Sequence, residues 1–161
     1  RVDVEDTDPR VLLAALDQWP SATGMGVDRS DAALGYARAN AERLGMAGRA
    51  DFRLGDWAEG IAERFDLVLI NPPYVAEGGE LGPGVAEFEP GEALFAGPEG
   101  LDEYRRLAPQ IPELIGSGGL AAIEIGADQA AAVGDLLLDA GLESTVASDL
   151  GGRPRVLLVK G

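Results

Sequence analysis

The 161-residue sequence contains no cysteine and no histidine. Their absence excludes a thiol nucleophile, a histidine general base and the zinc sites that proteins usually build. Basic residues are few as well: 13 Lys and Arg stand against 28 Asp and Glu, so the net charge is −15. A surface this acidic repels phosphate backbones, and it favours a protein partner with a basic face over a nucleic acid.

The sequence also lacks an apolar stretch long enough to cross a membrane, and it shows no signal peptide. We therefore expect a cytoplasmic protein that does not bind membranes. With 46% hydrophobic and 25% charged residues, the composition is that of a globular protein, and the length suits one domain with a sizeable core. Because residue 1 opens almost directly on a strand, we expect the chain to be part of a longer protein.

Hydrophobic patterning predicts strands that alternate with helices, which is typical of a mostly parallel α/β sheet. The predicted strands cover residues 1–4, 23–27, 51–54, 65–70, 120–125, 143–147 and 156–159. The predicted helices cover residues 9–19, 30–44, 101–115 and 128–140, the third of them irregular at its prolines. The linker between the last two strands is too short for a crossover helix, so these strands should form an antiparallel hairpin.

The most informative stretch is Asn71-Pro72-Pro73-Tyr74, which directly follows the predicted strand 65–70. Each proline fixes φ near −65° and lacks an N–H, so this turn is stiff and its carbonyls are available as acceptors. The Asn side-chain oxygen and a carbonyl can accept hydrogen bonds from one planar NH2 group, and the Tyr ring can lie flat against it. Such a site suits methyl transfer to an amide or exocyclic amine nitrogen, mainly by positioning and electrostatics.

Polar or aromatic residues also follow the two preceding strands. Asp28 ends one of them, where an acidic residue can accept hydrogen bonds from ribose hydroxyls, although an Asp after a strand is as often a helix cap. Asp56 can accept from an adenine amine, and Trp57 can lie against the ring, although an aromatic residue here is more often part of the core. We expect the carboxyl ends of these strands and of the strand before Asn71 to lie side by side and form one site.

In order along the chain, these motifs resemble those of the S-adenosylmethionine-dependent N5-glutamine methyltransferases of peptide chain release factors (the PrmC/HemK family). The motifs that carry the resemblance are Gly26-Val27-Asp28, Gly55-Asp56-Trp57, Phe65-Asp66-Leu67, Asn71-Pro72-Pro73-Tyr74, Phe88-Glu89-Pro90, Ala93-Leu94-Phe95, Gly100-Leu101-Asp102, Gly118-Gly119-Leu120, Glu124-Ile125-Gly126 and Asp149-Leu150-Gly151-Gly152-Arg153-Pro154-Arg155. Asn-Pro-Pro-Tyr is shared with adenine-N6 and guanine-N2 methyltransferases. The segments 88–90 and 100–102 point to the release-factor branch.

The resemblance implies a Rossmann-like class I methyltransferase fold, with a mostly parallel seven-stranded sheet that ends in an antiparallel hairpin. It implies S-adenosylmethionine as cofactor and a peptide chain release factor as protein substrate, and it implies no metal. In the cofactor site, Asp28 would hold the ribose and Trp57 would lie on the adenine, with Asp56 and Asn71 beside them.

For the substrate, the resemblance implies that Asn71 and the Pro72 carbonyl bind the glutamine amide and that Tyr74 packs on it. Asn71, Pro72 and Tyr74 would thus be the catalytic residues, and the whole turn, Pro73 included, would be the substrate site. No residue would serve as a strong general base.

Two features depart from the family pattern. The family's helical N-terminal domain, which helps to recognise the release factor, is absent from residues 1–161, so we expect a single methyltransferase domain truncated at its N-terminal edge. The family's glycine-rich loop falls on Glu5–Arg10, which contains no glycine. Because such glycines let the backbone approach the methionine end of the cofactor, and because Asp6 and Asp8 add negative charge there, we expect weakened cofactor binding.

Two other functions stay open on the sequence alone. One is an amino methyltransferase that acts on adenine or guanine in nucleic acid, against which the net charge of −15 argues. The other is a catalytically silent domain that binds a protein partner through Phe88–Pro90, which the glycine-free loop favours.

Overall fold

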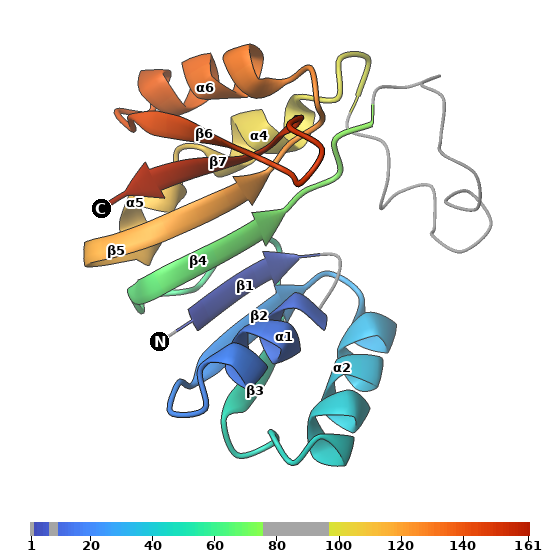
Figure 1. Cartoon of the computed structure of the whole chain (residues 1–161). Helices are drawn as coiled ribbons and strands as arrows, with labels where there is room; N and C mark the ends of the chain where they lie inside the picture. Colours follow the sequence, from blue (N-terminus) through green and yellow to red (C-terminus); the bar gives the residue numbers. More distant parts are fainter. Residues whose placement is uncertain (1, 7–9, 76–96) are drawn as a thin grey trace.

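The computed structural model describes residues 2–6, 10–75 and 97–161 of the chain (Figure 1). The strands are β1 (Val2–Asp6), β2 (Gly24–Asp28), β3 (Ala50–Leu54), β4 (Phe65–Asn71), β5 (Ile115–Glu124), β6 (Ser144–Ser148) and β7 (Pro154–Lys160). The helices are α1 (Arg10–Gln18), α2 (Asp31–Arg43), α4 (Asp102–Leu107), α5 (Ile111–Leu114) and α6 (Ala130–Asp139). None of the helices in these ranges is long and apolar enough to span a membrane.

All seven strands form one sheet in the order β3-β2-β1-β4-β5-β7-β6. The pairs from β3 to β5 are parallel, whereas β7 runs antiparallel to both β5 and β6. The predicted C-terminal hairpin is therefore confirmed. In Figure 1 the arrowheads of β1, β4 and β5 point to the same edge of the sheet, and the connection between β6 and β7 lies at that edge too.

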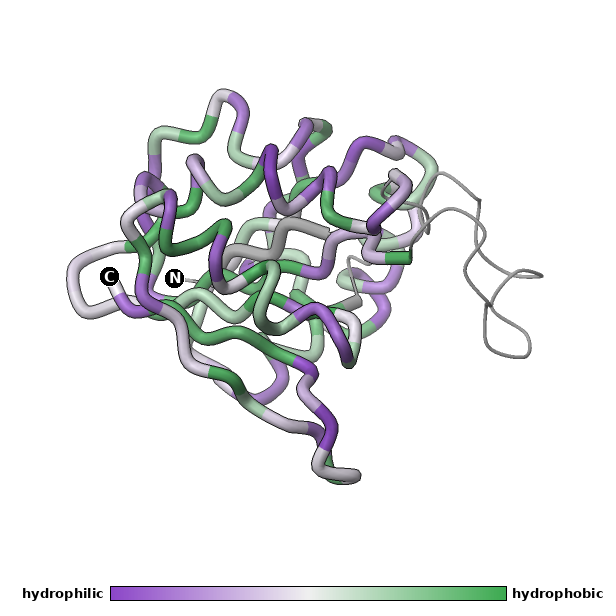
Figure 2. Tube along the Cα trace, turned by 90° about the horizontal axis from the view of Figure 1, so that it is seen from above, coloured by the Kyte–Doolittle hydropathy of each residue, from purple (hydrophilic) through white to green (hydrophobic). Residues whose placement is uncertain are grey.

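Helices cover both faces of the sheet, and each face has its own core. One core joins α1 and α2 to the side chains of Leu67 and Leu69 on β4. The other joins α4, α5 and α6 to Val68 and Ile70 of the same strand. This alternation follows from the two-residue period of a strand, and it explains why residues 65–70 form one continuous apolar run. In Figure 2 many of the hydrophobic segments of the trace run through the inside of the molecule, and hydrophilic segments are frequent at its outer turns.

The ends of α2 match the signals in the sequence. The Ser30 hydroxyl accepts a hydrogen bond from the backbone N–H of Ala33 at 3.2 Å, which satisfies one of the free donors of the first turn. After the helix, Gly45 has φ +71°, a left-handed conformation that glycine adopts without steric cost. Both ends of α2 thus lie where the sequence predicts them.

Three predictions of local structure are wrong. Glu5 and Asp6 belong to β1 and not to a loop, because the sheet pairs them with β4. The helix predicted over residues 101–115 is two short helices, since Pro109 and Pro112 cannot donate the backbone hydrogen bonds of a continuous helix. The following strand begins at Ile115, five residues before the predicted start.

The early start of β5 produces a bulge against β4. Phe65 pairs with Ile115, but Leu67 pairs with Leu120, so β5 holds extra residues between these two pairs. A glycine is required inside the bulge: a Cβ on Gly119 would lie 2.8 Å from the carbonyl oxygen of Phe65. Sequence periodicity does not reveal such a strand extension, because the glycines of the bulge carry no hydrophobic pattern.

Candidate active site at the carboxyl edge of the sheet

The sheet brings the ends of β2 and β4 to either side of β1. Glu5 of β1 is in register with Val27 on one side and with Ile70 on the other. Asp28 and Asn71, each one residue further along, therefore lie about 10 Å apart with the end of β1 between them. This corrects the expectation that the three motif-bearing strands are immediate neighbours: only β2 and β3 are.

The position of β1 is also the point at which the strand order reverses. The chain moves from β1 to β2 and β3 on one side, and β4 and β5 lie on the other side. Open α/β sheets bind their ligands beyond the carboxyl ends of the strands at such a point. The end of β4, which carries Asn71, is thus the edge where a ligand site is expected. The segment 7–9 of the glycine-free loop lies outside the described residues.

Asp28 is a buried carboxylate at the end of β2. The residue is 7% exposed, and within the described part of the chain it is the sole charged residue that is buried to this degree. One oxygen, Oδ1, accepts a hydrogen bond from the Ser30 N–H at 2.6 Å, just before α2 begins. The cap of α2 is Ser30 and not Asp28, and the contact of Asp28 with ribose hydroxyls stays a prediction. Burial of a carboxylate is costly without hydrogen-bond partners.

Asp56 is held from two sides after β3. Its Oδ2 accepts a hydrogen bond of 2.5 Å from Arg106 on α4, and Arg29 Nε lies 4.0 Å from its Oδ1. The hydrogen bond to Asp56 raises the pKa of Arg106. Oδ1 is a buried atom and accepts no hydrogen bond from the described residues. An acceptor of this kind, fixed in place by Arg106, is available to an amino group of a ligand.

Trp57 adopts a conformation that is rare for its residue type. Its φ is +53°, and it alone among the described non-glycine residues has positive φ. The residue is 7% exposed and packs in the larger core, and its Nε1–H donates to Glu103 Oε2 at 2.7 Å. Trp57 is therefore a core residue, as the alternative interpretation has it, and its contact with adenine stays a prediction.

The Asn-Pro-Pro-Tyr turn leaves β4 directly. Asn71 is the last residue of the strand, in register with Asp6 of β1, while Pro72 and Pro73 are buried. The Tyr74 hydroxyl lies 3.5 Å from Glu124 Oε1 on β5, at the long limit of a hydrogen bond. Burial raises the pKa of the Tyr74 hydroxyl, and the nearby charge of Glu124 raises it further. At neutral pH the phenol is thus protonated and uncharged.

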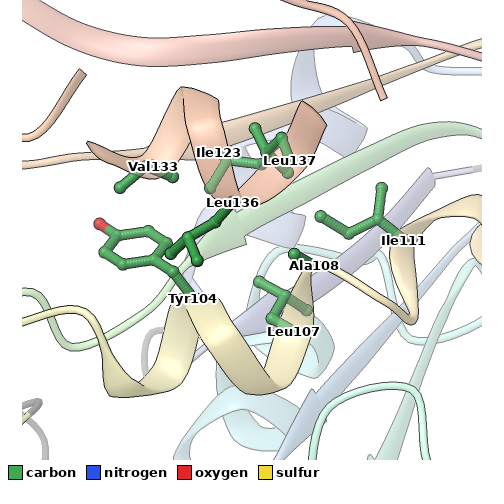
Figure 3. Close-up of a pocket in the computed structure, with 8 residues that line it drawn as sticks. All are labelled: Tyr104, Leu107, Ala108, Ile111, Ile123, Val133, Leu136 and Leu137. Atoms are coloured by element: carbon green, nitrogen blue, oxygen red, sulfur yellow. The ribbon is translucent and has the colours of Figure 1, made fainter. Parts of the chain in front are cut away.

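A second tyrosine connects this edge to α4. Tyr104 is buried, and its hydroxyl donates to the backbone carbonyl of Glu124 at 2.8 Å. Figure 3 shows its ring at one end of an apolar cluster between α4 and α6, beside Val133 and Leu136. This cluster leaves no space for a water molecule, so it is packing and not a binding pocket. It fixes α4, and hence Glu103 and Arg106, relative to β5.

The hairpin that follows β6 adds charged groups at the same edge. Asp149 Oδ1 accepts from the N–H groups of Gly151 and Arg153 at 2.8 and 3.0 Å, which orders the turn. These hydrogen bonds, that of Arg153 most strongly, lower the pKa of Asp149. Arg155 then lies 3.9 Å from Glu124 and 4.0 Å from Asp149. The family-like motif Asp149–Arg155 thus connects to the carboxylate beside Tyr74.

Sequence patterns did not single out Glu103, Arg106, Tyr104 or Gln129 as parts of this edge. Glu103 contacts Trp57 across 46 residues of sequence, and Arg106 contacts Asp56 across 50. Tyr104 contacts Glu124 across 20 residues, and Gln129 contacts Tyr74 across 55. No local pattern could have found them, since these pairs form only after α4 and α6 pack on the sheet. The motifs Phe88–Pro90 and Ala93–Phe95 lie outside the described residues.

The fold and the polar residues at its carboxyl edge define a class I Rossmann-like methyltransferase domain. The crystal structure of a methyltransferase from Pyrococcus furiosus matches with a TM-score of 0.71 at 16% identity, covering 99% of this chain and 74% of that one. The family model for the methyltransferase domain matches residues 10–106, more than half of the sequence. The chain therefore belongs to the methyltransferase domain family.

More specific similarity is found among the release factor glutamine methyltransferases. Those of Rhodospirillum rubrum and Caulobacter vibrioides are 44% and 45% identical to the chain, over 93% and 92% of its length. The resemblance inferred from the motifs is thus confirmed. The alignments cover 47% and 53% of those two proteins, so the chain spans about half the length of the curated relatives it matches.

Proposed function

We propose that this domain transfers a methyl group from S-adenosylmethionine to the side-chain amide nitrogen of a glutamine in a peptide chain release factor. The observation that carries the proposal is the position of Asn71: it ends β4, beside the end of β1, where the strand order reverses. The 44% identical relative from Rhodospirillum rubrum supports the choice of glutamine over a nucleobase. The net charge of −15 also disfavours a nucleic acid.

Asn71 and Tyr74 would act on the glutamine amide by orienting it. The Asn71 side-chain oxygen and the Pro72 carbonyl accept hydrogen bonds from the two amide protons, which points the nitrogen at the methyl donor. The neutral Tyr74 ring packs on the amide plane. In the transfer one C–S bond breaks and one C–N bond forms, and a proton leaves the nitrogen to water. Most of the rate gain then comes from positioning.

The residues at the ends of β2 and β3 fit the nucleoside part of S-adenosylmethionine, which supplies the electrophilic methyl group. Asp28 is a buried carboxylate that can accept hydrogen bonds from ribose hydroxyls. Asp56 Oδ1 is buried and accepts no hydrogen bond from the described residues, so it can accept from the adenine amine. Filling this position satisfies an acceptor that is otherwise costly to bury.

Methylation of purified release factor tests the proposal. The chain is incubated with methyl-labelled S-adenosylmethionine and release factor, and mass spectrometry of the digested substrate locates the added methyl group. The expected product is one glutamine that is heavier by one methyl group. A label on another residue type, or on RNA or DNA offered in parallel at low salt, would reject the assignment. Calorimetry with S-adenosylhomocysteine separates a silent domain, which releases no heat of binding, from an enzyme that lacks the right substrate.

A further inference from the structure

Gln129 connects the Asn-Pro-Pro-Tyr turn to two other segments of the edge. It immediately precedes α6, and its side chain is half-buried. Its Nε2 donates to the carbonyl oxygen of Tyr74 at 2.9 Å and to that of Gly100 at 3.3 Å. Its Oε1 accepts from the N–H of Gly126 at 2.9 Å. One side chain therefore joins the end of the turn, the glycine two residues before α4 and the segment after β5.

These contacts determine the orientation of the amide. Both partners of Nε2 are carbonyls, which can only accept, and the partner of Oε1 is an N–H, which can only donate. The backbone N–H of Gln129 also donates to the Gly126 carbonyl at 3.0 Å. This hydrogen bond holds the backbone of Gln129 beside Gly126 independently of its side chain. A Cβ on Gly126 would lie 2.9 Å from Gln129 Oε1, so a side chain there would displace the end of the Gln129 side chain.

The turn needs a hydrogen bond from a side chain because its own backbone has few donors. Pro72 and Pro73 have no N–H and so cannot bond the turn to a neighbouring strand. The Tyr74 carbonyl is held by Gln129, and the Tyr74 hydroxyl lies 3.5 Å from Glu124. The two contacts hold the residue at opposite ends, at its backbone and at the tip of its ring. The ring of Tyr74 also packs against the larger core, so loss of the Gln129 contact would release the residue at its backbone end.

We infer that Gln129 is a positioning residue for methyl transfer: it holds Tyr74, and with it Asn71, in the orientation that the acceptor amide requires. The inference rests on the proposed function for its catalytic part. Its structural part, that Gln129 immobilises Tyr74, stands without it. Gln129 touches neither reacting group, so its loss should lower kcat while the KM for S-adenosylmethionine stays unchanged.

The structural part is tested first, on the chain without substrate. Gln129→Met keeps the length of the side chain and removes both the donor and the acceptor, and Gln18→Met on the exposed end of α1 is the matched control. The protein holds three tyrosines, so 13C-tyrosine NMR resolves Tyr74 from exposed Tyr36 and buried Tyr104. In Gln129→Met we expect the Tyr74 ring signal to shift and broaden, with Tyr36 unchanged. A Tyr74 signal identical to that of the parent protein overturns the inference.

The catalytic part is tested with release factor and S-adenosylmethionine. Gln129→Met should lower kcat by about tenfold to a hundredfold, the typical effect of a misplaced reacting group. Gln129→Glu keeps the acceptor for Gly126 but turns a carboxylate towards two carbonyls. Its activity should recover as the pH falls, because a protonated carboxyl can donate to Tyr74 again. Gln18→Glu should show the pH profile of the parent protein.

The outcomes separate this inference from the proposed function. A parent chain that methylates no glutamine rejects the function, while the Tyr74 signal still decides whether Gln129 holds the turn. An active parent chain whose Gln129 variants keep kcat rejects the positioning role. A Gln129→Glu variant that loses activity equally at all pH values also rejects it, since a purely structural defect would not be relieved by protonation.

Discussion

The indole N–H of Trp57 donates a hydrogen bond of 2.7 Å to Oε2 of Glu103, although the two residues are 46 positions apart. Glu103 also binds Arg106, whose other nitrogen binds Asp56. A closed ring of contacts thus fixes Asp56 and Trp57 against α4. The positive φ of Trp57 is sustained by this ring, since such a conformation persists only where its surroundings determine it.

The first prediction concerns the environment of Trp57 when cofactor binds. Trp19, which is half-exposed, is the other tryptophan of the chain, so Trp19→Phe leaves Trp57 as the single tryptophan emitter. If adenine lies beside Trp57, S-adenosylhomocysteine should change the fluorescence of this variant in a saturable manner. The matched variant Trp57→Phe should show no change from Trp19. It should also be less stable by about 2 kcal/mol, because Glu103 loses a donor.

The second prediction concerns the adenine amine. Because Asp56 Oδ1 can only accept, an analogue that carries an oxygen in place of the amine should be rejected. We expect S-inosylhomocysteine to bind at least about a hundredfold more weakly than S-adenosylhomocysteine in calorimetry. Asp56→Asn introduces a donor, so the difference in affinity between S-adenosylhomocysteine and S-inosylhomocysteine should become smaller. Asp51→Asn, at an exposed position on β3, should leave it unchanged, and equal affinities in the parent protein would contradict the assigned role of Asp56.

The third prediction concerns Asn71. Asn71→Ala removes the side-chain acceptor for the substrate amide, so kcat for release factor methylation should fall by about a hundredfold or more. Asn40, the other asparagine of the chain, lies on α2 and binds Arg43, so Asn40→Ala serves as the control with near-parent activity. The midpoint of thermal unfolding reports folding in both variants. Near-parent turnover by Asn71→Ala would discard the proposed role of this residue.

The fourth prediction concerns stability at high pH. Burial raises the pKa of Tyr104 above its ordinary value, and the charges of Tyr74 and Glu124 add to this effect. Below about pH 10 the hydroxyl is protonated in both states, so its full stabilising contribution is present. Above that pH the unfolded chain loses the proton while the folded chain keeps it. The free energy of unfolding should therefore fall, by up to about 1.4 kcal/mol per pH unit for each such tyrosine.

Urea unfolding between pH 8 and 11 measures the slope of the free energy of unfolding against pH. Tyr104→Phe removes the titrating group and should flatten it, at a cost of about 1–3 kcal/mol at neutral pH because the Glu124 carbonyl loses its donor. Tyr36→Phe, at an exposed position on α2, should leave the slope as it is. A slope that Tyr104→Phe does not alter would mean that the hydroxyl titrates alike in both states.

Local patterns determined a large part of this protein. Alternation and apolar runs predicted the strands, Ser30 and Gly45 marked the ends of α2, and the short linker after residue 148 predicted the hairpin. These features depend on neighbours within a few residues, which is the range over which sequence patterns act. The stiff turn at Asn71–Tyr74 belongs to the same class, because proline restricts its own backbone.

Tertiary structure alone decided how the motifs meet. The order of the sheet places β1 between Asp28 and Asn71, and the packing of α4 and α6 brings Glu103 to Trp57 and Gln129 to Tyr74. These pairs are separated by 46 and 55 residues in the sequence. Their hydrogen bonds exist only once two apolar faces have closed on the sheet, and hydrophobic burial, which drives that closure, carries no directional information about which polar groups will become partners.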